Sequence, residues 1–327
     1  MPDVAAGEAR ALWYVGGGRA ELRREALGPP APGEALVRMI ASGVSRGTER
    51  LVASGKVPES EFATMRAPFQ AGDFPFPVKY GYQAVGIVED GPEALAGRTV
   101  FSLYPHQDRF ILPVAALVPL PDGLPPRRAT LAANMETALN ALWDAAAGPG
   151  DRIVIIGGGV VGLMLTALCC GLPGAEVTLV DIDSGRAVVA RSFGAAFALP
   201  EATPQDADVV FHASASAAGL ATAVAAAGIE ARIVELSWYG AGTIAAPLGG
   251  RFHSRRLSLI GSQVGRVSPS RRPRWDHARR LAKALDLVND ARFDALVTHT
   301  IAFAEAPDRL PQLLTASDAL GIVIAYP

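Results

Sequence analysis

The pattern of apolar residues along the chain changes near position 120. Before that point, short apolar segments alternate with Gly and Pro turns such as Gly16-Gly17-Gly18, which is typical of antiparallel strands. The segments expected as strands are 11–15, 35–40, 84–88, 99–103 and 110–112. This pattern predicts a compact, mostly antiparallel, barrel-like domain.

The second half of the chain has a different pattern of apolar residues. Residues 127–147 carry Ala and Leu at helical spacing until Gly148-Pro149-Gly150 ends the predicted helix. Uninterrupted apolar runs, expected as strands, then occupy 153–156, 177–180, 208–211 and 232–236, and helix-like segments occupy 160–170, 184–193 and 217–227. This alternation is typical of a parallel sheet covered by helices on both faces. Further on, 257–262, 295–303 and 321–325 resemble strands, and a helix is expected near 278–288.

Length and composition agree with a globular protein of two domains. The chain has 327 residues, of which 50% are hydrophobic and 19% charged. A net charge of −2 argues against a general nucleic-acid or membrane-surface binder. The uncharged run 153–175 is long enough to cross a bilayer, but three consecutive glycines and Pro173 favour a strand, a turn and a buried helix instead. The N-terminus lacks the pattern of a signal peptide, so we expect a cytoplasmic protein.

The cysteines restrict the chemistry. The chain has two cysteines, and they are the sequence neighbours Cys169 and Cys170. A disulfide scaffold is therefore excluded, as is a metal site that needs several separated thiolates.

A glycine-rich turn predicts a dinucleotide site. Residues 157–162 match Gly-x-Gly-x-x-Gly directly after a predicted strand and at the start of a predicted helix. In such a unit Gly157 permits the tight turn, Gly159 lets the backbone approach a pyrophosphate, and Gly162 lets the helix pack closely on the strand. Val160 and Val161 open the helix, whose N-terminal N–H groups face the phosphates.

An acidic residue strengthens this interpretation. Asp181 follows the second strand at the spacing of about 20 residues at which an acid binds the adenosine ribose. Because a carboxylate there repels a 2′-phosphate, the sequence favours NAD over NADP, although Arg186 nearby is a residue type that also meets phosphates. The alternative is that the glycines form an ordinary turn and that Asp181 caps the helix beginning near Ser184.

At this point the chain resembles the medium-chain dehydrogenase/reductase superfamily. The resemblance rests on Gly33-Glu34-Ala35-Leu36-Val37-Arg38, on 42–49 (Ser-Gly-Val-Ser-Arg-Gly-Thr-Glu), on 81–86 (Gly-Tyr-Gln-Ala-Val-Gly), on Thr137-Ala138-Leu139, on the glycine turn with Asp181 and on 298–300. It implies an α/β protein with a GroES-like β-barrel catalytic domain, 1–134 with 261–327, and a Rossmann domain with a doubly wound parallel sheet, 135–260. Thr137 and Ser214 are further candidates for contacts with the cofactor.

The chain departs from the zinc-dependent members of that superfamily. Those members have a cysteine at the position of Ser45, a His-Glu pair at Tyr82-Gln83 and a further cysteine near Ala133. The lobe that holds a second, structural zinc would fall between Val100 and Phe110, where this chain has no cysteine. The resemblance therefore implies a branch without either zinc.

Without a metal, a protein group must stabilise or protonate the substrate oxygen. Thr48 matches a proton-relaying hydroxyl of the zinc enzymes, Tyr82 stands where a zinc-binding histidine would be, and Glu136 is a carboxylate in an apolar segment. His106 is a fourth candidate, in a segment expected to be a surface loop. Each has a structural alternative: Thr48 as a turn cap, Tyr82 as a buried phenol, Glu136 as a salt bridge, and His106 as a residue without a role.

The segment 251–280 is rich in arginine and contains one acid, Asp276. It has the chemistry to receive an anionic substrate, but a solvated face or a set of internal ion pairs explains it as well. The superfamily uses the region of 257–262 as a dimer edge, so the resemblance implies a homodimer.

Together these features predict a zinc-independent oxidoreductase. It would transfer hydride between NAD(H) and a carbonyl, an alcohol or an activated double bond of a small substrate, with no nucleic acid or membrane as partner. A cofactor-binding sensor that has lost catalysis is the main alternative. A nucleic-acid-binding role for 251–280 is a third reading, which the net charge disfavours.

Overall fold

The computed structural model describes residues 7–327 of the chain. Two compact units are present: Met1–Ala133 together with Leu285–Pro327, and Asn134–Ala284. Residues 261–284, which we expected in the catalytic domain, cluster with the second unit.

The second unit is built around a six-stranded parallel sheet. Along the sheet the strand order is β12-β11-β10-β13-β14-β15, so the chain starts in the middle, runs outward to one edge, returns and runs to the other. The strands are β10 (Arg152–Ile156), β11 (Glu176–Val180), β12 (Ala196–Ala198), β13 (Ala207–His212), β14 (Ala227–Glu235) and β15 (Ser258–Gly261).

Helices of this unit connect and cover the strands. They are α3 (Ala132–Ala145), which begins at the boundary with the first unit, α4 (Val160–Cys170), α5 (Arg186–Ser192), α6 (Ala217–Ala226), α7 (Arg251–Ser254) and α8 (His277–Leu287), which ends in the first unit. Strand side chains such as Val154, Val210 and Ile233 are buried with Ala223 and Val224 of α6 in one apolar core. The continuous apolar runs of the sequence are thus explained by burial of the strands.

The first unit contains two sheets. One has four antiparallel strands in the order β2-β1-β5-β4: β1 (Glu8–Gly16), β2 (Arg19–Ala26), β4 (Ala71–Gly72) and β5 (Val78–Lys79). The other has seven strands: β3 (Glu34–Val44), β6 (Ala84–Asp90), β7 (Thr99–Ser102), β8 (Arg109–Pro113), β9 (Val118–Pro119), β16 (Val297–Ala302) and β17 (Gly321–Ala325).

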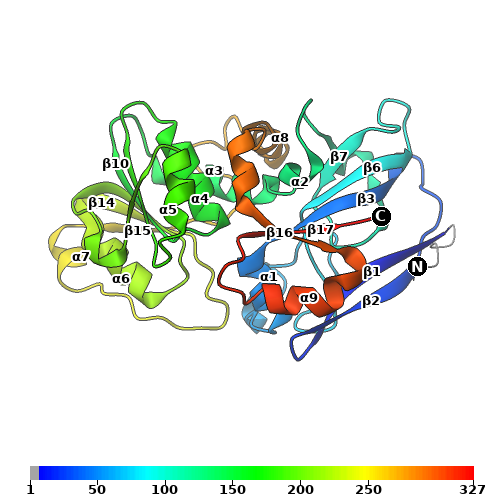
Figure 1. Cartoon of the computed structure of the whole chain (residues 1–327), viewed down its shortest axis with the longest axis horizontal. Helices are drawn as coiled ribbons and strands as arrows, with labels where there is room; N and C mark the ends of the chain where they lie inside the picture. Colours follow the sequence, from blue (N-terminus) through cyan, green and yellow to red (C-terminus); the bar gives the residue numbers. More distant parts are fainter. Residues whose placement is uncertain (1–6) are drawn as a thin grey trace. The chain divides into compact units, whose positions relative to one another are not determined.

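Residues 106–108 join these two sheets. The backbone N–H of Leu12 on β1 donates to the carbonyl of His106, and the N–H of Met39 on β3 donates to that of Asp108. In Figure 1 the red β17 runs beside the blue β3, with which it pairs antiparallel. The C-terminal segment therefore completes a sheet begun by the N-terminal one.

Short helices accompany the sheets of the first unit. They are α1 (Arg46–Ala53), α2 (Pro126–Ala129) and α9 (Ala306–Leu313), with 3-10 turns at Glu59–Glu61, Val114–Ala116, Ala291–Leu296 and Phe303–Glu305 and, in the second unit, at Pro200–Ala202. The single helix expected over 127–147 is divided into α2 and α3 at Thr130-Leu131. None of the helices formed by residues 7–327 has the length and hydrophobicity that crossing a bilayer requires.

Candidate functional site

The glycine turn lies between β10 and α4, as the sequence predicts. Gly157 has φ +109°, a conformation that favours glycine, and a Cβ there would lie 2.7 Å from the backbone nitrogen of Ser214. A Cβ on Gly162 would clash with the carbonyl oxygen of Gly157, so the first turn of α4 can pack on the loop only without a side chain.

The middle of the turn is open. A Cβ on Gly159 would meet no atom within 4 Å, and Gly159 is the N-cap of α4 without a side-chain cap. The N–H groups of the helix start, at Val160 and Val161, therefore carry the positive end of the helix dipole. A bare, open helix start of this kind suits the pyrophosphate of a dinucleotide.

Asp181 lies against this turn. One carboxylate oxygen accepts a hydrogen bond from the N–H of Gly158 (2.5 Å) and the other accepts one from the N–H of Asp183 (2.8 Å). Arg186, at the start of α5, pairs with Asp183 at 3.2 Å, and its methylene groups lie beside Gly158. Asp181 is thus held next to the glycine turn by backbone donors, and Arg186 already has a carboxylate partner.

The remaining cofactor candidates are also in the second unit. Thr137 is on α3, next to Glu136. Ser214 follows β13, is exposed, and lies beside Gly157 through its backbone. Its hydroxyl is 2.7 Å from Nε2 of the buried His212, whose Nδ1 is 2.6 Å from the carboxylate of Glu235. Neither His212 nor Glu235 is predicted as a site residue from the sequence, although each is a polar residue at the end of an apolar run.

In the first unit, Thr48 and Tyr82 are brought together. Thr48 is on α1, and the phenol of Tyr82 donates a hydrogen bond to its hydroxyl at 3.3 Å. Burial raises the pKa of Tyr82, and this effect outweighs the opposing hydrogen bonds to Ser45 and Thr48. The phenol therefore keeps its proton at neutral pH and is a donor.

His106 is not on a surface loop, as we expected, but completely buried. Its Nε2 is 3.0 Å from the carboxylate of Glu49, which also accepts hydrogen bonds from the Tyr14 phenol (2.7 Å) and the N–H of Ser45 (2.8 Å). On the other side, Nδ1 of His106 is 2.7 Å from the hydroxyl of Ser42. Because a carboxylate only accepts, Nε2 carries the hydrogen and Nδ1 accepts from Ser42.

Glu49 is the residue of this cluster that the sequence interpretation missed. It is completely buried, and through the N–H of Ser45 it fixes the start of α1, which carries Thr48. The only signal is its place in the segment 42–49. His106 consequently supports the position of Thr48 through Glu49, and the structure gives it no direct contact with Thr48 or Tyr82.

Glu136 belongs to a buried ion pair. Its carboxylate lies 3.0 Å from Nε of Arg280, and both side chains are almost fully buried. Burial raises the pKa of Glu136, and the charge of Arg280 and its hydrogen bond partly offset that rise. Arg280 also donates to Asn140 (2.8 Å) and to the carbonyl of Val264 (2.6 Å). This geometry supports the structural reading of Glu136 and explains why 261–284 clusters with the second unit.

Other arginines of 251–280 also have partners within the chain. The guanidinium of Arg255 donates to the carbonyl of Ala227, that of Arg256 pairs with Glu230, and that of Arg279 lies 4.0 Å from the ring centre of Trp275. These contacts favour internal ion pairing over an anion site.

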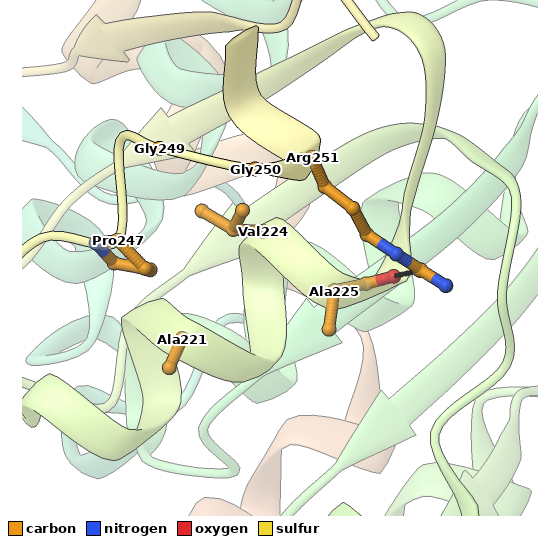
Figure 2. A pocket seen from close by; sticks show the side chains of 7 residues that line it. All are labelled: Ala221, Val224, Ala225, Pro247, Gly249, Gly250 and Arg251. Carbon is orange, nitrogen blue, oxygen red and sulfur yellow. Dashed lines mark hydrogen bonds between the residues drawn. The ribbon is translucent and has the colours of Figure 1, made fainter. Parts of the chain in front are cut away.

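A shallow pocket of about 450 Å³ lies elsewhere in the second unit (Figure 2). Its walls come from Ala221, Val224 and Ala225 of α6 and from Pro247, Gly249, Gly250 and Arg251. Figure 2 shows Arg251 reaching to the carbonyl of Ala225, to which it donates at 2.6 Å. None of the candidate residues lines this pocket.

The chain was compared with known proteins at the level of sequence and of structure. No protein-family model matches it. An uncharacterised zinc-type alcohol dehydrogenase-like protein of Haemophilus influenzae is 28% identical over 216 residues, which are 62% of this chain and 58% of the relative. The chain thus matches less than two thirds of the length of that relative.

Solved structures of dehydrogenases match along nearly the whole chain. L-idonate 5-dehydrogenase from Escherichia coli superposes with a TM-score of 0.79 at 15% identity, over 97% of this chain and 98% of the other. A short-chain alcohol dehydrogenase from E. coli CFT073, complexed with NADH, gives 0.77 at 15% identity, over 98% and 100%. A candidate zinc-binding dehydrogenase from Sinorhizobium meliloti, bound to NADP, gives 0.76 at 18% identity, over 97% and 99%.

The chain has the medium-chain dehydrogenase/reductase fold. The expected fold class, a GroES-like barrel with a Rossmann domain, is thereby confirmed. At the positions where the sequence resemblance places zinc ligands, this chain has Ser45, Tyr82 and Ala133, which offer hydroxyl and methyl groups and not the thiolate, imidazole or carboxylate groups that zinc takes. Across residues 7–327, no three His, Cys, Asp or Glu side chains gather into a group that could hold a metal ion. The side chains of Ser45, Tyr82 and Ala133 therefore do not provide the donor atoms that zinc prefers.

Proposed function

We propose that this chain is an oxidoreductase that prefers NAD(H) to NADP(H) and works without zinc. It would transfer hydride to or from a carbonyl, an alcohol or an activated double bond of a small substrate. The observation that carries the proposal is the open glycine turn at the start of α4 with the carboxylate of Asp181 beside it. The dehydrogenases that share the fold support it further.

The residues of the turn suit a nicotinamide dinucleotide. The backbone N–H groups of Gly159, Val160 and Val161 would hold the pyrophosphate, and Asp181 would accept hydrogen bonds from the adenosine ribose. When bound, the nicotinamide ring supplies the hydride acceptor or donor. A 2′-phosphate would bring its negative charge close to Asp181, which is why we propose a preference for NAD(H).

The proton would move through the hydroxyl groups of the first unit. The Tyr82 phenol, kept protonated by its raised pKa, would donate to the substrate oxygen as hydride arrives at the carbon. In the structure this hydrogen is donated to Thr48, so the phenol would turn it toward the substrate oxygen, and Thr48 would then donate its own hydrogen to the phenol oxygen. Glu49 and His106 would hold α1 and thereby Thr48 in place.

Titration of purified protein with NADH and NADPH, followed by fluorescence, tests the cofactor half of the proposal. Wild type should bind NADH at least tenfold more tightly than NADPH, which corresponds to about 1.4 kcal/mol. Asp181→Ser should bring the two affinities closer together, whereas Asp122→Ser, at an exposed site in the other unit, should leave their ratio unchanged. Asp181→Asn removes the charge and keeps one acceptor oxygen, which can accept from the N–H of Gly158 or of Asp183 but not from both. Binding of neither nucleotide would refute the proposal.

Activity assays test the catalytic half of the proposal and distinguish an enzyme from a cofactor-binding sensor. We expect NADH oxidation with at least one member of a panel of aldehydes, ketones and activated alkenes, and a loss of kcat of about 100-fold in Tyr82→Phe with NADH affinity unchanged. The replaced zinc positions motivate the alternative of a non-catalytic cofactor-binding protein, which would bind NADH and turn over nothing. Stoichiometric zinc after extensive dialysis, found by elemental analysis, would contradict the zinc-free mechanism.

We also propose that the chain forms a homodimer through β15. This strand is the last of the parallel sheet, so one of its sides has no neighbour in the described part of the chain. Leu259 on β15 is 40% exposed. An exposed apolar edge strand invites pairing with another strand, and a second copy of the same chain offers an equivalent edge.

A further inference from the structure

The ends of β13 and β14 carry a chain of polar groups that the proposed mechanism does not use. His212 and Glu235 are paired residues on these neighbouring strands, and their side chains meet at 2.6 Å. His212 is completely buried. Within residues 7–327 it does not belong to a cluster of side chains that could bind a metal ion. A buried imidazole with both nitrogens within hydrogen-bond distance of side chains has its orientation fixed.

The direction of each hydrogen bond follows from Glu235. Burial alone would raise the pKa of Glu235, but the hydrogen bond from His212, the electrostatic attraction of His212 and the hydrogen bonds from Ser237 together outweigh it and hold the pKa below its usual range. The carboxylate is therefore charged at neutral pH, and it accepts from Nδ1–H of His212, from the Tyr239 phenol (3.1 Å) and from the N–H of Ser237 (2.8 Å). With its hydrogen on Nδ1, a neutral His212 accepts at Nε2, so the Ser214 hydroxyl donates to it at 2.7 Å.

The Ser214 hydroxyl has a second hydrogen-bond partner, the hydroxyl of Ser216. As the N-cap of α6, Ser216 accepts the N–H of Gly219 at 3.0 Å, and its own hydroxyl lies 3.0 Å from that of Ser214. Ser216 thus donates to Ser214. The Ser214 oxygen then has its hydrogen and one lone pair engaged, and one lone pair remains on an exposed residue.

The backbone of Ser214 is next to the dinucleotide turn. β13 pairs with β10, and the backbone of Ser214 lies against Gly157, the first residue of the turn. The carboxyl ends of these parallel strands form the edge at which sheets of this kind bind ligands.

We propose that His212 is a positioning residue for the cofactor, and that Glu235 fixes its tautomer. Together they hold the Ser214 hydroxyl as a hydrogen-bond acceptor for a donor of the bound dinucleotide, a ribose hydroxyl or the carboxamide N–H. The proposal rests on the proposed function, because the ligand is the same dinucleotide. It adds a donor-selective contact that is separate from Asp181.

A double-mutant cycle on the full chain tests it, with NADH as the probe. Ser214→Ala should weaken NADH binding by about three- to tenfold, the usual effect of one hydrogen bond. His212→Leu should weaken it by a similar factor, and the double variant should be no weaker than either single variant, because His212 acts through Ser214. His212→Gln, which keeps an acceptor on a side chain of similar reach, should recover part of the affinity. Thr222→Ala, which removes a hydroxyl from α6 away from the chain of contacts, should bind as wild type does.

Two further readouts separate this role from a merely structural one. Thermal unfolding of each variant reports any loss of stability, against which the loss of NADH affinity is compared. NMR of ¹⁵N-labelled imidazole should show the Nδ1–H tautomer of His212 in wild type, and the Nε2–H tautomer would overturn the inference. Factors that multiply in the double variant, or unchanged affinity in Ser214→Ala, would also overturn it. If wild type binds neither NADH nor NADPH, the proposed function fails, and the inference fails with it.

Discussion

At the scale of single residues, the three glycines of the turn have different physical roles. Gly157 is required by its backbone conformation and by the closeness of Ser214, and Gly162 by the carbonyl of Gly157. Gly159 has ordinary backbone angles and open space around the position of a Cβ. Gly157 and Gly162 are therefore required by the fold, whereas Gly159 is not, and its open position is where we propose that the ligand binds.

This distinction predicts opposite outcomes for two substitutions of the same kind. Gly162→Ala should lower the free energy of unfolding by about 2 kcal/mol or more, because α4 must move away from the turn to make room for the methyl group. Gly159→Ala should leave stability within about 0.5 kcal/mol of wild type and weaken NADH binding at least tenfold, because its methyl group occupies the space meant for the pyrophosphate. Denaturant unfolding and fluorescence titration measure the two effects. Equal stability loss in both variants would contradict the assignment.

The residues that could be predicted from the sequence are those whose chemistry is local. The glycine turn and Asp181 follow one another at a fixed spacing, so a single stretch of sequence suffices to propose them. Glu49 and His106 are 57 positions apart, and His212 and Glu235 are 23 apart. The first pair joins helix α1 to a loop and the second joins two neighbouring strands, and one sequence contains no signal of which distant residues will meet.

At the scale of elements, α8 and the segment before it contact α3 through a buried ion pair, hydrogen bonds and aromatic packing. Arg280 of α8 meets Glu136 and Asn140 of α3, and the N–H of Ser268 donates to Asn140 at 3.1 Å. Trp275 packs on Trp143 of α3 with ring centres 4.8 Å apart. The arginine-rich segment thus contributes a buried arginine, Arg280, that holds α8 against α3 in the second unit.

Loss of the ion pair between Arg280 and Glu136 should lower the stability of the protein. Arg280→Met should reduce the free energy of unfolding by about 3 kcal/mol, because it leaves the carboxylate of Glu136 buried without its partner. Arg279→Met, next to it but exposed, should change stability by less than about 1 kcal/mol. Adding Glu136→Leu to Arg280→Met should restore much of the loss, since no charge is then left in the interior. Urea unfolding of these four proteins and of the single variant Glu136→Leu makes the comparison, and an additive double variant would show that the pair is not coupled.

Elements with a strong apolar pattern are where the sequence predicts best. The helix predicted over 160–170 is α4, and the apolar runs of the second unit are β10, β11, β13 and the end of β14. β2 is missed because its residues, Arg19–Ala26, are mostly charged and it forms by pairing with β1 along its length. α9 is missed for a related reason: it contains Pro311 and is held by packing against β2 and β16.

At the scale of the whole molecule, the chain leaves the first unit and returns to it. β16 and β17 close the seven-stranded sheet by the antiparallel pairing of β17 with β3, which begins far earlier in the sequence. The point of return could not be placed from the sequence, because residues 261–284 carry no composition break and are assigned by the buried contacts of Arg280. The family resemblance predicts the order of the domains, whereas their boundaries are set by packing contacts such as those of Arg280.

The last prediction concerns the assembly of two chains through β15. Wild type should sediment at twice the chain mass of 34.0 kDa. Leu259→Lys places a charge on the exposed edge strand and should shift the protein to monomer, since lysine on an edge disfavours strand pairing. Val188→Lys is the matched control, because Val188 is an apolar residue on α5 that is 74% exposed and lies away from β15. This variant should remain dimeric. A monomeric wild type would refute the dimer, whereas a dimer that tolerates Leu259→Lys would move the interface to another face.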